Sequence, residues 1–310
     1  MNQSNIFQEA EIKSFEQLDL LARQVVEGFI IGLHKSPFHG FSVEFAEHRI
    51  YNEGESTRNI DWKVYARTDK MFSKKYEEET NLRCHFILDI SSSMYFPKEQ
   101  KNTKMNFSVL AIASLIELLK RQRDAFSLST FDEEVKIHTA SKSSVTHKNM
   151  IYLHLLQALQ SQAQKKTNAI QCIHEIAENI PKRSLVVIFS DMFDTEAIHS
   201  EKQEKLFEAL QHLKFNKHEI LFFHVVDQKQ EVEFQFENRP YLFIDMESGN
   251  ELKFNASQVK AHYLEKINQF NKALKLRCQQ YQIDYITAPI DQGFKQILMP
   301  YLIKRAKVKK

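Results

Sequence analysis

The stretch from Leu82 to Met94 reads Leu-Arg-Cys-His-Phe-Ile-Leu-Asp-Ile-Ser-Ser-Ser-Met. Its short apolar run, bounded by polar turn residues, is typical of a buried strand rather than of a helix. In an open α/β sheet, ligands bind in the loops just past the carboxyl ends of the strands. We therefore expect Asp89, Ser91 and Ser93 to lie together at such a rim, where all three would offer oxygen. Taken alone, the pattern is equally typical of a serine-rich turn that caps a helix.

The composition bounds the class of protein. The chain has 310 residues, of which 43% are hydrophobic and 26% charged, as in an ordinary soluble protein that can bury a full core. The formal net charge of +2 gives no field that would attract nucleic acid or an anionic membrane surface. Cys84, Cys172 and Cys278 lie far apart, so they form neither a zinc pattern nor a disulfide framework. This spacing fits a reducing compartment.

No segment of the sequence indicates export or membrane insertion. The N-terminus is polar and is not followed by the apolar core of a signal peptide. The longest apolar stretch, from Val109 to Leu119, contains Ser114 and Glu117 and is far too short to span a bilayer. We therefore expect a cytoplasmic protein with no membrane span.

Strand and helix patterns alternate through most of the chain after Leu82. The run from Ser184 to Phe189 is apolar on both faces, as a central parallel strand should be. Further strands are expected at 125–131, 135–138, 219–226 and 283–287, and helices at 103–121, 150–160, 169–179, 201–213, 257–280 and 291–304. The sequence therefore predicts an α/β fold with a doubly wound, mainly parallel sheet and helices on both faces.

Two additions to this core are expected. Residues 1–80 would form an N-terminal accessory segment packed on the main domain of residues 81–306, because the amphipathic helix at 14–33 needs an apolar face to cover. Alternating apolar residues at 231–237 predict a half-buried strand, with 241–245 as its partner in an inserted β-hairpin. Residues 307–310 would be a basic tail, solvated at the end of the last helix.

Two later positions add oxygen donors to the predicted rim. Thr167 precedes a helix, and Asp191 follows the strand that ends at Phe189. Carboxyl ends of parallel strands lie on one edge of a sheet, so Asp89 and Asp191 should face each other if their strands are neighbours. Two carboxylates and three hydroxyls suit Mg²⁺, or Mn²⁺ or Ca²⁺ in its place, better than Zn²⁺. The sequence therefore predicts a metal site formed by Asp89, Ser91, Ser93, Thr167 and Asp191.

The segment from Glu47 to Arg67 mixes charges of both signs around the single tryptophan, Trp62. One interpretation is a recognition surface for a partner. The other is an internal network in which Arg49, Arg58 and Arg67 pair with Glu53, Glu55 and Asp61. Near-equal numbers of the two signs favour the internal network.

The order of the rim residues resembles a known site. Asp89-x-Ser91-x-Ser93, then Thr167, then Ser190-Asp191 is similar to the metal-ion-dependent adhesion site of von Willebrand factor A domains. The more specific pattern is Arg49-x-Tyr51-x-x-Gly54-x-x-x-Arg58-x-Ile60-Asp61-Trp62-x-x-x-Ala66-Arg67. Together they resemble the bacterial MoxR-associated von Willebrand factor A-like family, a domain family of unknown function, over about residues 15–304. One departure is Met192-Phe193-Asp194 after Asp191, where adhesive domains usually have glycine.

This resemblance implies a metal-dependent protein–protein interaction module rather than an enzyme. Ser91, Ser93 and Thr167 would bind the metal, and Asp89 and Asp191 would act directly or through water. An acidic residue of a partner would complete the coordination. Members of the family are thought to act as adaptors for MoxR-type AAA+ ATPases in protein maturation or complex assembly, so such an ATPase is the implied partner.

Two alternatives remain open. A metal-dependent phosphatase or nuclease could use Asp89, Asp191, Asp194 and Asp227 as a two-metal rim. Against it, Ser91 stands where a second carboxylate would be expected, and the patterns G-x-S-x-G, G-x-x-x-x-G-K-S/T and H-E-x-x-H do not occur. The other alternative is a scaffold with a vestigial metal site, which the full set of oxygen donors disfavours.

Overall fold

The computed structural model describes residues 12–32, 45–50, 62–76, 82–97, 102–160, 168–192, 200–246, 249–294 and 296–298. The chain divides into two units. Residues 1–37 and 83–310 form the main unit, and residues 38–82 form the small one. The predicted boundaries at residues 80 and 306 stay predictions.

A six-stranded sheet in the order β10-β7-β6-β3-β4-β5 forms the centre of the main unit. Its first five strands run parallel to their neighbours, and β5 pairs antiparallel with β4. The strands are β3 (Arg83–Asp89), β4 (Ala125–Phe131), β5 (Val135–His138), β6 (Leu185–Ser190), β7 (Glu219–Val226) and β10 (Asp284–Pro289). Every residue of β6 is buried, which explains why this strand is apolar on both faces.

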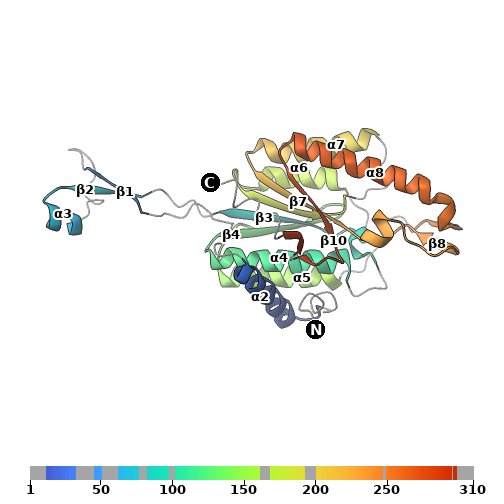
Figure 1. Ribbon diagram of the computed structural model, residues 1–310, viewed down its shortest axis with the longest axis horizontal. Coiled ribbons are helices and arrows are strands. Elements are labelled where there is room, and N and C mark those ends of the chain that lie inside the picture. The colour runs from blue at the N-terminus through green and yellow to red at the C-terminus, as the bar shows by residue number, and fades with distance from the viewer. Residues whose placement is uncertain are drawn as a thin grey trace. The chain divides into compact units, whose positions relative to one another are not determined.

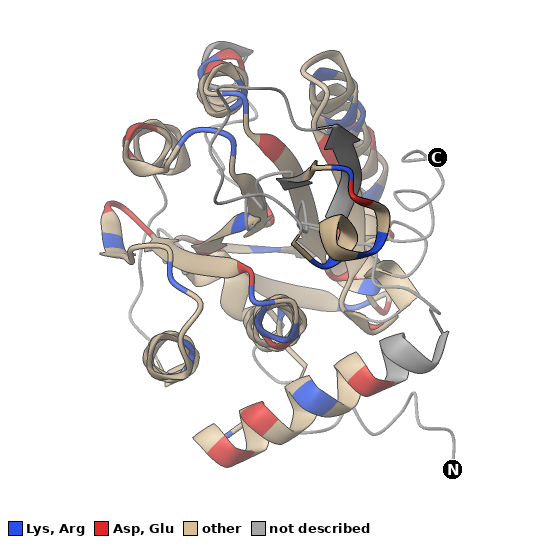
Figure 2. Ribbon diagram, turned by 90° about the vertical axis from the view of Figure 1, so that its left-hand side faces the viewer, with Lys and Arg blue, Asp and Glu red and all other residues tan. Residues whose placement is uncertain are grey.

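Helices cover both faces of this sheet (Figures 1 and 2). On one side lie α4 (Lys104–Arg121) and α5 (Val145–Gln160). On the other lie α6 (Ala169–Asn179), α7 (Ser200–Phe215) and α8 (Ala256–Gln280), whose apolar side chains form one buried cluster with Ile87, Ile188 and Phe222 of the sheet. The predicted α/β fold with a mainly parallel, doubly wound sheet is confirmed. Within the described residues, no helix is both long and apolar enough to cross a membrane.

The amphipathic helix α2 (Phe15–Gly32) packs against α4 of the main unit. It buries Leu18, Ala22 and Val26, in keeping with its helical spacing of apolar residues. Asp19, on the same helix, accepts a hydrogen bond at 2.6 Å from the buried ammonium of Lys148 on α5. Packing against α4 covers the apolar face of α2, which the isolated helix would expose to water.

The N-terminus of α4 is capped by Thr103, whose side chain accepts the Asn106 N–H at 3.0 Å. We expect Thr103→Ala to lower the free energy of unfolding by about 1 kcal/mol, because it leaves an orphan N–H at the helix start. Thr103→Ser keeps the hydroxyl and should stay close to the wild type. Urea denaturation of the three proteins measures the difference, and equal stability of Thr103→Ala and Thr103→Ser would contradict it.

An inserted hairpin is present, but the prediction of its first strand is wrong. The hairpin pairs β8 (Pro240–Ile244) with β9 (Glu251–Asn255), whereas residues 228–232 form the single-turn π-helix η3 and residues 233–239 form no strand. The Phe234 and Phe236 rings contact each other at 4.8 Å between centroids, and both contact Phe243 of β8. Their alternation in the sequence therefore reflects an aromatic cluster and not a strand.

The small unit pairs β1 (Phe45–Ile50) antiparallel with β2 (Phe72–Tyr76) and contains α3 (Trp62–Thr68). The Trp62 side chain is 58% exposed and packs edge-on against Tyr65, with the ring centroids 6.1 Å apart. Both interpretations of the segment from Glu47 to Arg67 stay open, because residues 51–61 lie outside the described part of the chain.

Candidate functional site at the carboxyl edge of the sheet

Four adjacent strands each place an aspartate at the same edge of the sheet. Asp89 is the last residue of β3, and Asp132, Asp191 and Asp227 come within one residue of the ends of β4, β6 and β7. Since β7, β6, β3 and β4 are neighbours in that order, these residues form one acidic row. The predicted neighbourhood of the strands that carry Asp89 and Asp191 is confirmed by the parallel pairing of β3 with β6.

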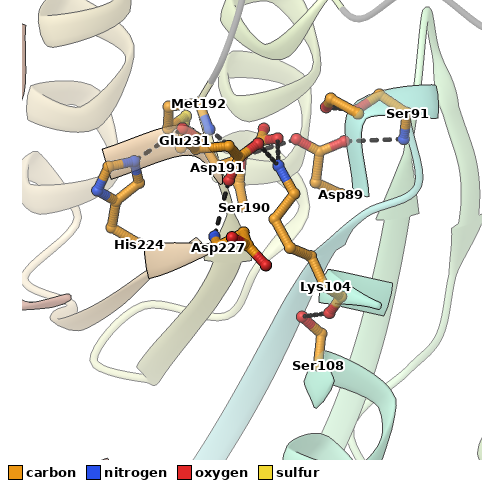
Figure 3. Close-up of polar contacts among 11 residues, drawn as sticks. Asp89, Ser91, Lys104, Ser108, Ser190, Asp191, Met192, His224, Asp227 and Glu231 are labelled. Atoms are coloured by element: carbon orange, nitrogen blue, oxygen red, sulfur yellow. Dashed lines mark hydrogen bonds and ion pairs between the residues drawn. The ribbon is translucent and has the colours of Figure 1, made fainter. Parts of the chain in front are cut away.

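The loop after β3 is built around the Asp89 carboxylate. The Ser91 N–H donates to Asp89 Oδ1 at 2.9 Å, and the Ser190 hydroxyl, from β6, donates to Oδ2 at 2.7 Å. The hydroxyls of Ser91 and Ser93 lie 3.1 Å apart, at the start of the short 3₁₀-helix η2 (Ser92–Tyr95). Two hydrogen bonds, from Ser91 and Ser190, thus fix the Asp89 carboxylate (Figure 3).

A lysine lies in the middle of the site. The Lys104 side chain extends from the first residue of α4 and is completely buried. Its ammonium is 2.6 Å from Asp191 Oδ2 and 2.6 Å from Glu231 Oε1 (Figure 3). It also lies 5.8 Å from the centre of the Phe96 ring. The site therefore already contains one positive charge, and it contacts one of the predicted metal ligands.

The second carboxylate that contacts Lys104 belongs to the π-helix after β7. Asp227 begins this turn by accepting the Gln230 N–H at 2.7 Å through Oδ1. The Asp227 N–H donates to Glu231 Oε2 at 2.8 Å, which leaves Glu231 Oε1 to bind the lysine. Single π-turns are found preferentially at functional sites. Here the turn places Glu231 at the rim.

The backbone after Asp191 is held in an unusual conformation. His224 of β7 donates from Nε2 to the Asp191 carbonyl at 2.9 Å, since a carbonyl can only accept. The next residue, Met192, has φ +48°, and its N–H donates to the Ser190 hydroxyl at 2.8 Å. This is the left-handed region that favours glycine. The chain thus adopts with methionine a conformation suited to the glycine of adhesive domains.

The electrostatics of the rim follow from burial and from the single ammonium. Burial raises the pKa of Asp89 to about 6, and repulsion by Asp191 adds to the effect. Burial alone would lower the pKa of Lys104, but the Asp191 and Glu231 carboxylates more than offset this and hold it above its ordinary value. Burial also raises the pKa of Glu231, against the attraction of Lys104. The rim thus favours added positive charge.

The structure brings four of the five predicted ligands to one edge. Asp89, Ser91, Ser93 and Asp191 all lie there and are at most 9% exposed. Thr167 lies outside the described residues, as does Asp194 of the alternative two-metal rim. The N-cap position of α6 is Asn168. The Asn168 N–H donates at 2.9 Å to the Asp132 carbonyl, so the residue after Thr167 contacts the end of β4.

Sequence reasoning missed the cation at the site and one of its partners. Lys104 sits in an otherwise apolar helix start, Lys-Met-Asn-Phe, directly after the Thr103 cap, and a lysine at that place is ordinary on a solvated helix. Glu231 belongs to the stretch predicted as a half-buried strand, so its side chain was expected to face solvent. Only the fold of the π-turn and the pairing of β6 with β7 bring Glu231 toward Lys104.

The oxygen donors of the rim fit a hard divalent cation, although Lys104 already binds one of the Asp191 oxygens. Carboxylate and hydroxyl oxygens are the ligands that Mg²⁺ and Mn²⁺ prefer. Among the described residues, no group of three or more His, Cys, Asp or Glu side chains could hold a metal by itself. Asp191 Oδ2 is bound to Lys104, so a metal that takes this oxygen as a ligand would replace the ion pair.

Together, the parallel sheet and its strand-end rim define an α/β domain with a candidate ligand site at its carboxyl edge. Residues 47–272 match the family model described as "Protein of unknown function DUF58". Because the match covers most of the 310 residues, the chain belongs to this family.

The curated relatives are described only as uncharacterized. "Uncharacterized protein Rv1480" of Mycobacterium tuberculosis (strain H37Rv) is 30% identical over 79 residues, which are 26% of this chain and 25% of the relative. "Uncharacterized protein Mb1516" of Mycobacterium bovis shows the same identity and coverage. The chain thus spans about a quarter of the length of the curated relatives it matches.

Solved structures show distant likenesses. The conserved hypothetical protein BatB from Bacteroides thetaiotaomicron has a TM-score of 0.43 at 12% identity, covering 73% of this chain and 99% of BatB. The SpRpn10 VWA domain has a TM-score of 0.36 at 10% identity, covering 72% of this chain and 95% of that domain. Both scores are low, so the fold assignment rests on the sheet topology itself.

Proposed function

We propose that this protein is a non-enzymatic protein–protein interaction module whose rim binds Mg²⁺, or Mn²⁺ or Ca²⁺ in its place. The observation that supports this is the meeting of Asp89, Ser91, Ser93 and Asp191 at the ends of two adjacent parallel strands. Thr167 would supply a third hydroxyl. A metal held by neutral hydroxyls and by carboxylates that act partly through water keeps a position for an outside ligand, and an acidic side chain of a partner would occupy it.

The partner is a MoxR-type AAA+ ATPase, with the protein acting as a cytoplasmic adaptor in protein maturation or complex assembly. This part of the proposal rests on the resemblance of the Arg49 to Arg67 pattern and of the rim to the MoxR-associated von Willebrand factor A-like family. The neighbouring genes give a direct check, because a gene for such an ATPase beside this one is expected.

A second candidate is a scaffold whose rim holds no metal. The Lys104–Asp191 ion pair favours it, because a buried ammonium already neutralises one of the proposed ligands. In this case the rim would be a structural centre, and partners would bind elsewhere. The two candidates differ in whether divalent metal changes partner binding.

We expect Asp89→Ala and Ser91→Ala/Ser93→Ala to weaken Mn²⁺ binding at least about tenfold, because they remove a charge and two hydroxyl ligands. Electron paramagnetic resonance of free Mn²⁺ measures the affinity. Ser114→Ala is the matched control, since this buried hydroxyl donates to the Leu110 carbonyl within α4 and not to the rim.

Pull-down of a MoxR-type AAA+ ATPase tests the function itself. The wild type and Ser114→Ala should retain the ATPase in Mg²⁺ and lose it in EDTA, and both rim variants should fail in either buffer. Retention by all four proteins regardless of metal would support the scaffold instead.

A further inference from the structure

Lys104 places a buried positive charge between two carboxylates of the rim. Its ammonium lies between Asp191 and Glu231, and its side chain is 0% exposed. Asp89 repels Asp191 across the same edge. A buried ammonium between carboxylates is costly to desolvate and is stable only while both partners remain. A site built this way keeps a cation at Asp191 whether or not metal is present.

We propose that the Lys104 ammonium is the resident counter-ion of the rim and competes with a divalent cation for Asp191. It holds the rim together in the absence of metal and lowers the affinity for metal. This inference rests on the proposed metal site and assigns its regulation to a residue outside the predicted ligand set.

Competition follows from geometry and charge. A metal that takes Asp191 Oδ2 as a direct ligand needs the oxygen that Lys104 holds at 2.6 Å. A divalent ion and an ammonium a few ångströms apart also repel each other strongly in a poorly solvated site. Metal therefore binds well only when Lys104 withdraws from Asp191.

Glu231 gives the displaced lysine a place to remain. Its Oε1 already accepts from Lys104 at 2.6 Å, and Oε2 is fixed by the Asp227 N–H. The ammonium can therefore stay paired inside the protein after it leaves Asp191. The Glu231 carbonyl accepts from the Tyr263 hydroxyl of α8 at 2.9 Å, which connects this reserve position to the helix that follows the hairpin.

The test compares Lys104→Met with Lys148→Met in Mn²⁺ titrations. Lys148 is a matched control, because it is also buried, at 3% side-chain exposure, and also binds two carboxylates, Asp19 and Glu117, away from the rim. We expect Lys104→Met to bind Mn²⁺ at least about tenfold more tightly than the wild type, and Lys148→Met to match the wild type. In addition, Mn²⁺ should raise the melting temperature of Lys104→Met more than that of either other protein.

Lys104→Met leaves two carboxylates without their ammonium, so a second variant covers the outcome in which it does not fold without metal. A Lys104→Met protein that folds only when Mn²⁺ is present supports the proposal. If Lys104→Met folds neither with nor without Mn²⁺, the Glu231→Gln variant provides the test. Because this variant lacks the Glu231 carboxylate, Lys104 should stay on Asp191. The Mn²⁺ affinity of Glu231→Gln should therefore be severalfold lower than that of the wild type. Glu134→Gln controls for loss of one negative charge, since Glu134 is 73% exposed and pairs with Lys136.

The outcomes separate this inference from the proposed function. Equal Mn²⁺ affinity in the wild type and Lys104→Met overturns the competition and leaves a metal-dependent module intact. Binding by Lys104→Met alone supports the competition and overturns metal dependence of the natural protein. If Lys104→Met does not fold with or without Mn²⁺, an unchanged Mn²⁺ affinity in Glu231→Gln also overturns the competition. If neither the wild type nor any variant binds Mn²⁺, both ideas are overturned.

Discussion

Lys104→Met is expected to lower the free energy of unfolding by about 3–5 kcal/mol in metal-free buffer at pH 7. The substitution keeps an unbranched side chain, shorter by one atom, but removes the ammonium that pairs with Asp191 and Glu231 at 2.6 Å each. Two carboxylates in a poorly solvated site would then lack a counter-charge. Urea denaturation followed by circular dichroism gives the difference.

A charge-balanced variant separates this cause from lost packing. Lys104→Met/Asp191→Asn/Glu231→Gln removes the two carboxylates with the ammonium, so it should recover most of the loss. A triple variant as unstable as Lys104→Met would show that packing of the lysine stem, and not its charge, stabilises the rim. A loss below about 1 kcal/mol in the single variant would contradict the prediction outright.

The second large expected effect is a loss of stability in acid that originates at His85. This side chain lies between Ser127 and Ser129 of β4, with its Nδ1 and Nε2 at 2.7 and 2.8 Å from their hydroxyls. Burial, with a smaller contribution from repulsion by the nearby His138 and His218, lowers the pKa of His85 to about 3. The core therefore holds His85 neutral.

The direction of the pH effect follows from the difference in proton binding between the folded and the unfolded chain. The unfolded chain binds a proton near the ordinary pKa of 6.5, whereas the folded chain does so only near pH 3. Stability from neutral His85 is therefore complete above pH 6.5 and is lost as the pH falls from 6.5 toward 3. The loss approaches about 1.4 kcal/mol for each pH unit, or about 2 kcal/mol between pH 6.5 and 4.5.

His85→Gln isolates this contribution, because an amide can still donate to one serine and accept from the other. The stability difference between the wild type and His85→Gln should shrink by about 2 kcal/mol between pH 6.5 and 4.5, since only the wild type carries this titration. His262→Gln, on the exposed side of α8, is the control for loss of a surface imidazole. A pH-independent difference for His85→Gln would contradict the assignment.

The strands and helices were readable where local pattern and burial agree. The run at 184–189 is apolar on both faces because β6 lies at the centre of a covered parallel sheet. The strand at 219–226 was predicted with the bounds of β7. Around 231–237 the alternation of apolar and polar residues predicted a strand that is not there. Phe234 and Phe236 alternate because both belong to one aromatic cluster, and the residues before them form a π-turn that Asp227 caps.

Part of the candidate site was predictable from the sequence. Asp89, Ser91 and Asp191 follow strands in the sequence, and the rule that parallel strands end on one edge was enough to bring them together. Lys104 and Glu231 are separated from these residues along the chain and gave no local signal. Their contact depends on the angle at which α4 begins and on the π-turn after β7, which are properties of the packed fold.

By itself, the sequence of this protein determined the order of the strands and helices of the central sheet, the acidic and hydroxyl-bearing strand ends, and the edge on which they meet. These features follow from short-range hydrophobic periodicity and from the direction of parallel strands. Tertiary structure alone decided that a buried lysine neutralises Asp191 and that Glu231 shares it. The physical reason is that charge pairing in a protein interior depends on distances of a few ångströms between residues far apart in the chain, and local pattern carries no record of those distances.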